Sequence, residues 1–245
     1  MHINRRKSFA ISFPLRSFLG RYPSLFYFLY GLVPKNRTLS VKKNTQIVIE
    51  GFPRSANTFA VGAFNRIQPI KLRIAHHMHV PAQVIRAVHW KIPTIVLIRD
   101  PKDAVVSLVT YDSRISINQA LRCYVSFYKA IYFCRSKYIV AFFEEVISDY
   151  SKIIEKTNDK FNTKFVSRSF AEAEVNSIFQ RIESIGEIEA TRQEKTECSE
   201  LNVARPSLTR ACLKRELMQK LEEPQNNKIL KDAERIYADF ILNCS

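Results

Sequence analysis

Residues 51–58, GFPRSANT, carry the residue types that proteins use to bind phosphate. The apolar segment QIVIE precedes them and FAVGAFNRI follows, an order that predicts a strand, a tight turn and the start of a helix. Backbone N–H groups at a helix start bind anions, and Ser55, Asn57 and Thr58 add side-chain donors. Arg54 adds a planar cation that can bind a phosphate with two hydrogen bonds. The segment therefore predicts an anion-binding loop, with an ordinary turn and a solvated arginine as the alternative.

This loop lacks the lysine of the nucleoside triphosphate-binding loops. Their pattern is G-x-x-x-x-G-K-[ST]. In that register Ala56 stands at the second glycine and Asn57 at the lysine, while the cation lies three positions earlier, at Arg54. Magnesium–nucleoside triphosphate chemistry would be without its main charge clamp.

A second candidate phosphate site begins where the apolar segment TIVLIR, residues 94–99, ends. Arg99 closes this predicted strand, Asp100 and the proline after it turn the chain, and Ser107 lies one to two turns into a new helix. Arg99 and Ser107 could therefore converge on one further phosphate. For a single arginine at a strand end, a surface salt bridge is the alternative.

Taken together, the two motifs resemble those of the sulfotransferases that use 3'-phosphoadenosine 5'-phosphosulfate (PAPS). In that family the first loop reads P-[KR]-S-G-[TN]-T and binds the 5'-phosphosulfate side, and the second reads R-x-x-x-D-x-x-x-S and binds the 3'-phosphate. PRSANT and RDPKDAVVS match both, including the step from Arg99 to Ser107 and the central Asp103. Ala56 replaces the usual glycine. The resemblance covers about residues 46–161 and is weaker beyond.

The resemblance also implies which residues bind the donor nucleotide. Phe59 matches an aromatic residue that packs near the adenine, and Arg205 lies in a late basic stretch of the kind that closes over the 3'-phosphate. A solvated basic helix is the alternative for that stretch. The implied nucleotide-binding residues are Arg54, Ser55, Ala56, Asn57, Thr58, Phe59, Arg99, Ser107 and Arg205.

Four of the five histidines lie between residues 76 and 89. A metal site is not expected there, because no Asp, Glu or Cys lies nearby and the spacing of His77 and His79 is poor for chelation. The family has a K-x-H-x-P-like stretch between its two phosphate motifs, whose histidine removes the proton of the acceptor. HMHVP places His79 at that base and His77 at the lysine. A neutral imidazole with a pKa near ~6.5 suits this role, with Arg54 stabilising the leaving group; histidines without a role are the alternative.

The hydrophobic pattern predicts an α/β fold. Strands are expected at residues 46–50, 94–99 and 138–143, and helices at residues 57–66, 81–89, 101–111, 117–137, 149–161, 170–185, 208–221 and 227–242. Because strands alternate with helices early in the chain, we expect a central parallel sheet in a three-layer α/β/α arrangement, with the helical C-terminal part packed on it. Ligands of such sheets bind at the carboxyl ends of the strands, where both motifs stand. The resemblance implies the P-loop-like sulfotransferase version of this fold.

The net charge of +15 favours an anionic partner. No zinc-finger spacing, helix-turn-helix signal or ladder of aromatic residues is found, so a specific nucleic-acid partner is not expected. The five cysteines form no C-x-x-C pair, which favours reduced, buried thiols in a cytoplasmic protein.

Residues 1–45 form a basic and apolar N-terminal arm with a polar connector, and residues 46–245 form the predicted sulfotransferase domain. Nine basic residues precede the first acidic one, Glu50. The longest uncharged stretch of the arm, residues 22–34, falls short of the ~20 apolar residues that cross a bilayer. Arg16 and Arg21 interrupt the apolar part, unlike in a signal peptide. The arm is therefore expected either to pack on the domain or to lie on an anionic membrane surface.

These observations predict a PAPS-dependent sulfotransferase that acts on a hydroxyl or amine of a glycan, a lipid or a small molecule without a metal. One alternative is a small-molecule P-loop kinase that uses magnesium–ATP, with Asp100 as its magnesium ligand. The other is a non-catalytic protein that resembles a sulfotransferase.

Overall fold

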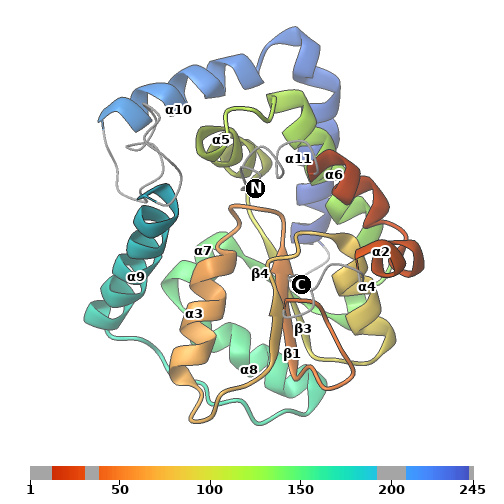
Figure 1. Ribbon diagram of the computed structural model, residues 1–245, viewed down its shortest axis with the longest axis vertical. Coiled ribbons are helices and arrows are strands. Elements are labelled where there is room, and N and C mark those ends of the chain that lie inside the picture. The colour runs from red at the N-terminus through yellow and green to blue at the C-terminus, as the bar shows by residue number, and fades with distance from the viewer. Residues whose placement is uncertain (1–12, 31–38, 192–207, 243–245) are drawn as a thin grey trace.

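The computed structural model of the chain describes residues 13–30, 39–191 and 208–242 (Figure 1). In this part of the chain four strands form one sheet in the order β2-β1-β3-β4, and every neighbouring pair is parallel. The strands are β1 (Ile47–Gly51), β2 (Ile74–His76), β3 (Thr94–Ile98) and β4 (Ile139–Phe142). Helices cover both faces, which confirms the predicted three-layer arrangement with a central parallel sheet.

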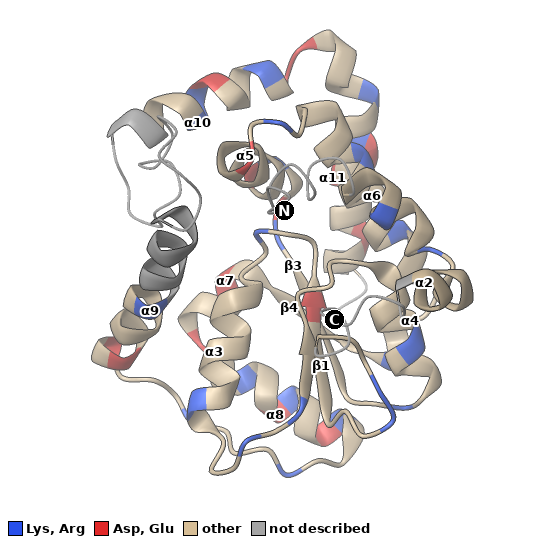
Figure 2. Ribbon diagram, in the orientation of Figure 1, with Lys and Arg blue, Asp and Glu red and all other residues tan. Residues whose placement is uncertain are grey.

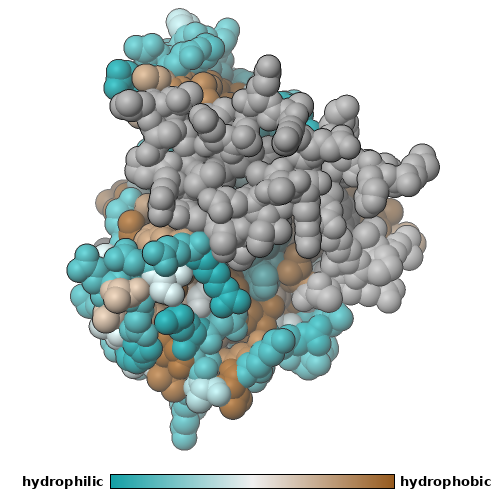
Figure 3. All heavy atoms as spheres, turned by 60° about the vertical axis from the view of Figure 1, so that its left-hand side comes forward, coloured by the Kyte–Doolittle hydropathy of each residue, from teal (hydrophilic) through white to brown (hydrophobic). Residues whose placement is uncertain are grey.

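The helices account for most of the remaining described residues. They are a short segment at residues 13–19, then α2 (Pro23–Tyr30), α3 (Asn57–Ile67), α4 (Pro81–His89), α5 (Pro101–Tyr111), α6 (Ile117–Tyr132), α7 (Phe143–Ser148), α8 (Tyr150–Phe161), α9 (Glu172–Thr191), α10 (Leu208–Leu221) and α11 (Asn227–Leu242). On the side of the molecule that carries α9, the described surface is largely hydrophilic, with hydrophobic side chains between (Figure 3).

Several predicted elements differ from the observed ones. The bounds of α4, α5, α10 and α11 are as predicted, whereas the helix expected to reach residue 137 ends at Tyr132, before a 3₁₀ turn at Arg135–Lys137. Strand β2 was not expected, because three residues at a sheet edge show no periodicity. Helix α7 was not expected either.

Alternate residues of a strand are buried on opposite faces of the sheet. In β3, Ile95 and Leu97 pack into the core that contains residues of α3 and α8, while Val96 and Ile98 pack into the core that contains residues of α5 and α6. All five residues of β3 are buried. This burial on both sides explains the continuous apolar run, which is typical of a central parallel strand.

A close approach of β1 to β3 requires the glycine at the end of β1. A Cβ atom on Gly51 would lie 2.4 Å from the carbonyl oxygen of Leu97 and 2.9 Å from its Cβ. Any side chain would therefore push the two strands apart. The two strand ends that carry the sequence motifs are held together at this point.

The described part of the arm packs on the domain. Phe13 is buried in the α5–α6 core with its ring 6.2 Å from that of Phe52, and Phe26 is buried with Met78 and Val80. No helix in the described ranges is long and apolar enough to cross a membrane.

The cysteine prediction is wrong in one place. Cys123 and Cys134 are buried thiols, but Cys212 on α10 is exposed. The remaining two cysteines lie outside the described residues.

Candidate functional site

The two predicted phosphate motifs meet at one edge of the sheet. Because β1 and β3 are parallel neighbours, the loops after them leave from the same end. The Arg54 Nε donates a hydrogen bond to the Ser107 Oγ (3.1 Å), and the Arg99 Nη1 donates one to the Arg54 carbonyl oxygen (3.2 Å). The structure thus joins three side chains from two segments that are far apart in the sequence.

Neighbours of Arg99 hold its guanidinium in one place. The group stacks on the ring of Phe143 at 4.0 Å, and its Nη2 lies 3.5 Å from the Asp103 Oδ2, one helical turn into α5. The side chain is 17% exposed. Asp103, the central residue of the second motif, therefore orients the arginine.

The Asp100 side chain caps the start of α5. Its carboxylate accepts hydrogen bonds from the backbone N–H groups of Lys102 (2.9 Å) and Asp103 (3.2 Å), which makes it the N-cap of the helix. This use of the carboxylate disfavours its service as the magnesium ligand of a kinase.

The Arg54 side chain points toward α5. Besides its bond to Ser107, its guanidinium lies 5.1 Å from the centre of the Tyr111 ring. Arg54 was expected beside the amide groups of the loop and the leaving group. The observed orientation groups it instead with Arg99 and Ser107, on the side expected for the 3'-phosphate.

The loop before α3 is strained and has no side-chain cap. Arg54 and Ala56 have φ angles of 69° and 66°, and Ala56 is the N-cap residue without a capping hydrogen bond from its side chain. The first N–H groups of a helix have no partner within the helix, so here they are open to an anion. The family's glycine at the position of Ala56 adopts such a φ angle without strain.

Two of the three predicted side-chain donors of this loop face inward. Ser55 is fully buried beside the hydroxyl of Tyr128, and Asn57 donates its amide N–H to the Phe52 carbonyl oxygen (2.9 Å). Thr58 is exposed. Both side chains thus face the protein interior, and their part in ligand binding stays a prediction. The backbone N–H groups and Thr58 are the other donors of the loop.

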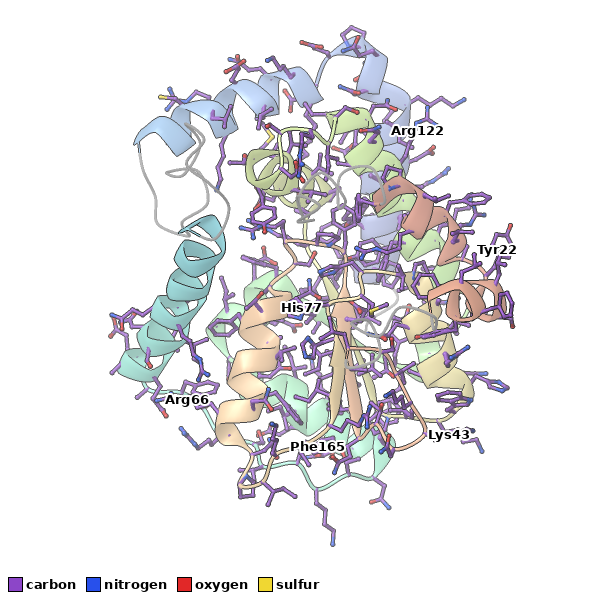
Figure 4. The ribbon with its side chains drawn as sticks, viewed as in Figure 1. Tyr22, Lys43, Arg66, His77, Arg122 and Phe165 are labelled. Carbon is purple, nitrogen blue, oxygen red and sulfur yellow. The ribbon has the colours of Figure 1, made fainter. Side chains whose placement is uncertain are left out.

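A cluster of histidine rings follows β2 and lies beside the loop. The ring centres of His76 and His77 are 4.7 Å apart, and those of His77 and His79 are 5.6 Å apart. The His77 Nε2 is 3.1 Å from the Thr58 Oγ1, which links the cluster to the start of α3 (Figure 4). His77 and His79 have φ angles of 55° and 52°. Strained residues of this kind gather at functional sites.

His79 is held as a neutral imidazole with a defined tautomer. Its Nδ1 lies 2.8 Å from the Gly51 carbonyl oxygen, which only accepts hydrogen bonds, so Nδ1 carries the proton and Nε2 does not. Burial lowers the pKa of His79 to about 4, and it also lowers the pKa values of His76 and His77. The expected pKa near 6.5 was wrong because it took no account of burial. The unprotonated Nε2 can accept a proton at neutral pH.

Glu50, which the sequence analysis did not select, positions this histidine. Its carboxylate is fully buried and accepts hydrogen bonds from the N–H groups of Gly51 (3.1 Å), Met78 (2.9 Å) and His79 (3.1 Å) and from the Gln83 side chain (2.9 Å). Burial raises the pKa of Glu50 to about 7. It is the sole acidic residue of the four described strands (Figure 2). A glutamate inside the apolar run QIVIE was the signal that could have identified it.

Two buried tyrosines of α6 hold the strand ends. The Tyr128 hydroxyl donates to the Leu97 carbonyl oxygen (2.8 Å) and accepts from the N–H of Phe52 (3.4 Å), while the Tyr124 hydroxyl donates to the Arg99 carbonyl oxygen (2.8 Å). Burial raises the pKa of both hydroxyls, so they stay protonated donors. In the sequence, nothing distinguishes these two tyrosines from the other residues that line the buried side of the helix.

Other predicted residues lie apart from the site or outside the described residues. Phe59 is 3% exposed, and its ring packs 5.1 Å from that of Phe179 in the core, which speaks against a contact with adenine. Arg205 lies outside the described residues. Within residues 13–30, 39–191 and 208–242, no three His, Cys, Asp or Glu side chains are grouped to hold a metal ion.

A surface hollow lies at the opposite end of the strands. It is lined by Gln46 and Pro93, which precede β1 and β3, together with Phe161 and Phe165. The ligand-binding end of a parallel sheet is the carboxyl end, so this hollow is separate from the candidate site.

No protein-family model matches the sequence. No curated protein sequence matches it either. Among solved structures, the chain is similar to the crystal structure of mouse sulfotransferase SULT7A1 complexed with PAP, with 14% sequence identity and a TM-score of 0.39. The similar region covers 80% of this chain and 92% of that chain.

Proposed function

We propose that the chain is a PAPS-dependent sulfotransferase that transfers a sulfuryl group to a hydroxyl or amine of an acceptor. One observation carries the proposal: Arg54, Arg99 and Ser107 converge at the ends of β1 and β3. At the same end of β1, the Gly51 carbonyl oxygen accepts a hydrogen bond from His79. The site thus combines anion-binding groups with a neutral base, the two requirements of sulfuryl transfer from a nucleotide.

The residues present fit such a nucleotide in two parts. The uncapped N–H groups at the start of α3, with Thr58, would bind the 5'-phosphosulfate, because a helix start stabilises negative charge. Arg54, Arg99 and Ser107 would bind the 3'-phosphate, where an arginine can donate two parallel hydrogen bonds.

The proposed step needs one proton acceptor. His79 Nε2 takes the proton of the acceptor hydroxyl or amine while that oxygen or nitrogen bonds to sulfur. The bond from sulfur to the 5'-phosphate oxygen breaks, and 3',5'-adenosine bisphosphate leaves. Thr58 and the neighbouring His77, with the helix N–H groups, would stabilise the charge that grows on the leaving phosphate. We propose no metal for this step, since the helix start supplies partial positive charge and hydrogen-bond donors to the leaving phosphate.

Nucleotide binding tests the proposal directly. We expect 3',5'-adenosine bisphosphate to raise the Tm without magnesium, and radiolabelled PAPS to transfer its label to an acceptor in a fractionated cell extract. Stabilisation by magnesium–ATP alone would support a kinase instead. Binding of the bisphosphate without any transfer would support a non-catalytic protein.

The role of Arg99 can be tested against a matched arginine. Arg99→Ala removes charge-assisted hydrogen bonds and should raise the Kd for the bisphosphate by about 10- to 100-fold. Arg66→Ala, on an exposed part of α3 away from the site (Figure 4), should leave the Kd unchanged. Equal effects of the two substitutions would contradict the assignment.

A further inference from the structure

The described part of the N-terminal arm has two apolar faces, and the domain covers only one. The inner face buries Phe13 and Phe26 in the domain cores. The outer face consists of large apolar side chains that are 41–72% exposed: Leu15, Phe18, Tyr22, Leu25, Phe28 and Leu29. Six such side chains on one short segment form a surface that is costly to leave in water.

The elements around this outer face carry positive charge and no exposed acidic residue. Residues 1–99 contain 16 Lys and Arg residues and one acidic residue, Glu50, which is fully buried. Helix α4, which packs on α2, and helix α6, which packs on α4, contain no Asp or Glu. Tyr22, Lys43 and Arg122 lie along the same side of the molecule in Figure 4. The apolar face is thus framed by cations that no neighbouring carboxylate on these elements neutralises.

Aromatic and basic side chains alternate beside the outer face. The Arg86 guanidinium lies 3.3 Å from the centre of the Tyr27 ring and 5.2 Å from that of Trp90, and the Lys43 Nζ lies 4.6 Å from the Trp90 ring. Aromatic rings next to long basic side chains are typical of segments at the boundary between lipid headgroups and acyl chains.

We propose that the outer face of the arm docks on an anionic lipid bilayer. The exposed Phe and Leu side chains would enter the boundary of headgroups and acyl chains, while Lys43, Arg86 and Arg122 bind lipid phosphates. A second copy of the chain fits less well, because two basic faces would repel each other. Nucleic acid fits less well because it would leave the leucines in water. The proposal stands apart from sulfuryl transfer.

Vesicle binding of the full chain tests the apolar part of this surface. Without nucleotide, the chain should co-sediment with phosphatidylcholine vesicles that contain phosphatidylserine, and less with phosphatidylcholine alone. Phe18→Ser with Phe28→Ser should lower the partition coefficient about tenfold or more, because two exposed rings no longer enter the bilayer. Leu242→Ser is the matched control, since Leu242 is 74% exposed on α11 and Phe28 is 72% exposed. Equal binding by the wild type, the Phe18→Ser, Phe28→Ser variant and the Leu242→Ser variant would overturn the proposal.

Two double charge reversals that give the same net charge test the basic part of this surface. Lys43→Glu with Arg122→Glu should reduce binding to the phosphatidylserine vesicles about tenfold or more. Lys160→Glu with Lys164→Glu, on exposed positions of α8 and the segment after it, changes the net charge by the same amount. This control pair should bind the vesicles much more tightly than the pair at Lys43 and Arg122. Equal losses in both pairs would mean nonspecific charge attraction and would overturn the proposal. A dimer in sedimentation velocity that Phe18→Ser with Phe28→Ser abolishes would assign the face to a second copy.

Discussion

At the scale of single residues, His79 is the group on which the proposed chemistry depends. His79→Asn keeps a side-chain N–H for the Gly51 carbonyl oxygen and tolerates the φ angle of 52°, but it has no basic nitrogen. We expect turnover to fall by about 10²- to 10⁴-fold, with an unchanged Kd for 3',5'-adenosine bisphosphate. His89→Ala, on the exposed end of α4, is the control. Normal turnover in His79→Asn would remove His79 from the mechanism.

The lowered pKa of His79 also sets the pH dependence of the reaction. A general base must be unprotonated, so kcat/KM for the acceptor should be lost only as the pH falls through the pKa of about 4. It should be level between about pH 5.5 and 7, unlike in an enzyme with an ordinary histidine. A rate that halves near pH 6.5 would mean that another group is the base.

Glu50 and His79 affect the free energy of unfolding in opposite directions. The folded chain raises the Glu50 pKa from 4.5 to about 7, so this contribution is present below pH 4.5 and is lost as the pH rises to 7. It lowers the His79 pKa from 6.5 to about 4, so that contribution is present above pH 6.5 and is lost as the pH falls. Between these values the two slopes offset each other.

Glu50→Gln should therefore unmask the acid sensitivity of His79. Between pH 6.5 and 4.5 its free energy of unfolding should fall more steeply on acidification than that of the wild type, by up to about 1.4 kcal/mol per pH unit. Urea titrations at several pH values measure the difference. Glu172→Gln, at an exposed position of α9, should follow the wild type. Parallel curves for Glu50→Gln and wild type would refute the assignment.

At the scale of elements, alanine substitutions at two glycines should change stability in opposite directions, because only Gly51 lies at the close approach of β1 and β3. Gly51→Ala places a Cβ against the Leu97 carbonyl and should destabilise the fold by about 1–3 kcal/mol. Gly62→Ala, in the middle of α3, meets only the Ile178 Cγ2 at 3.7 Å and should stabilise it by about 0.5–1 kcal/mol. Urea unfolding of both variants checks the signs, and a stable Gly51→Ala would disprove the close approach.

The elements were easier to predict from the sequence than the contacts between them. Buried strands and amphipathic helices depend on local pattern, so three strands of the parallel sheet were predicted near their positions and four helices with their bounds. The meeting of the loop after β1 with the segment after β3 followed from the rule that parallel neighbouring strands end at one edge of the sheet. In contrast, the burial of Phe59 depends on a distant partner, Phe179. The four hydrogen bonds to Glu50 likewise come from segments up to 33 positions away, which a local pattern does not encode.

At the scale of the whole molecule, the arm is part of the fold as well as of the proposed membrane surface. Phe26 is fully buried beside Met78 and Val80, so Phe26→Ala should destabilise the chain by about 3–5 kcal/mol. Phe28→Ala, two positions on and 72% exposed, should change stability by less than about 0.5 kcal/mol. Urea unfolding distinguishes them. Equal and small effects would mean that the arm does not contribute to folding.

The carboxylate of Glu50 receives its four hydrogen bonds from β1, from the segment after β2 and from α4. It can leave water at low cost only when all three are in place, because a buried carboxylate without donors is strongly unfavourable. Formation of the histidine loop should therefore be cooperative with formation of the whole sheet. In native-state hydrogen exchange, the amides of Met78 and His79 should exchange only through global opening, although they lie in a loop.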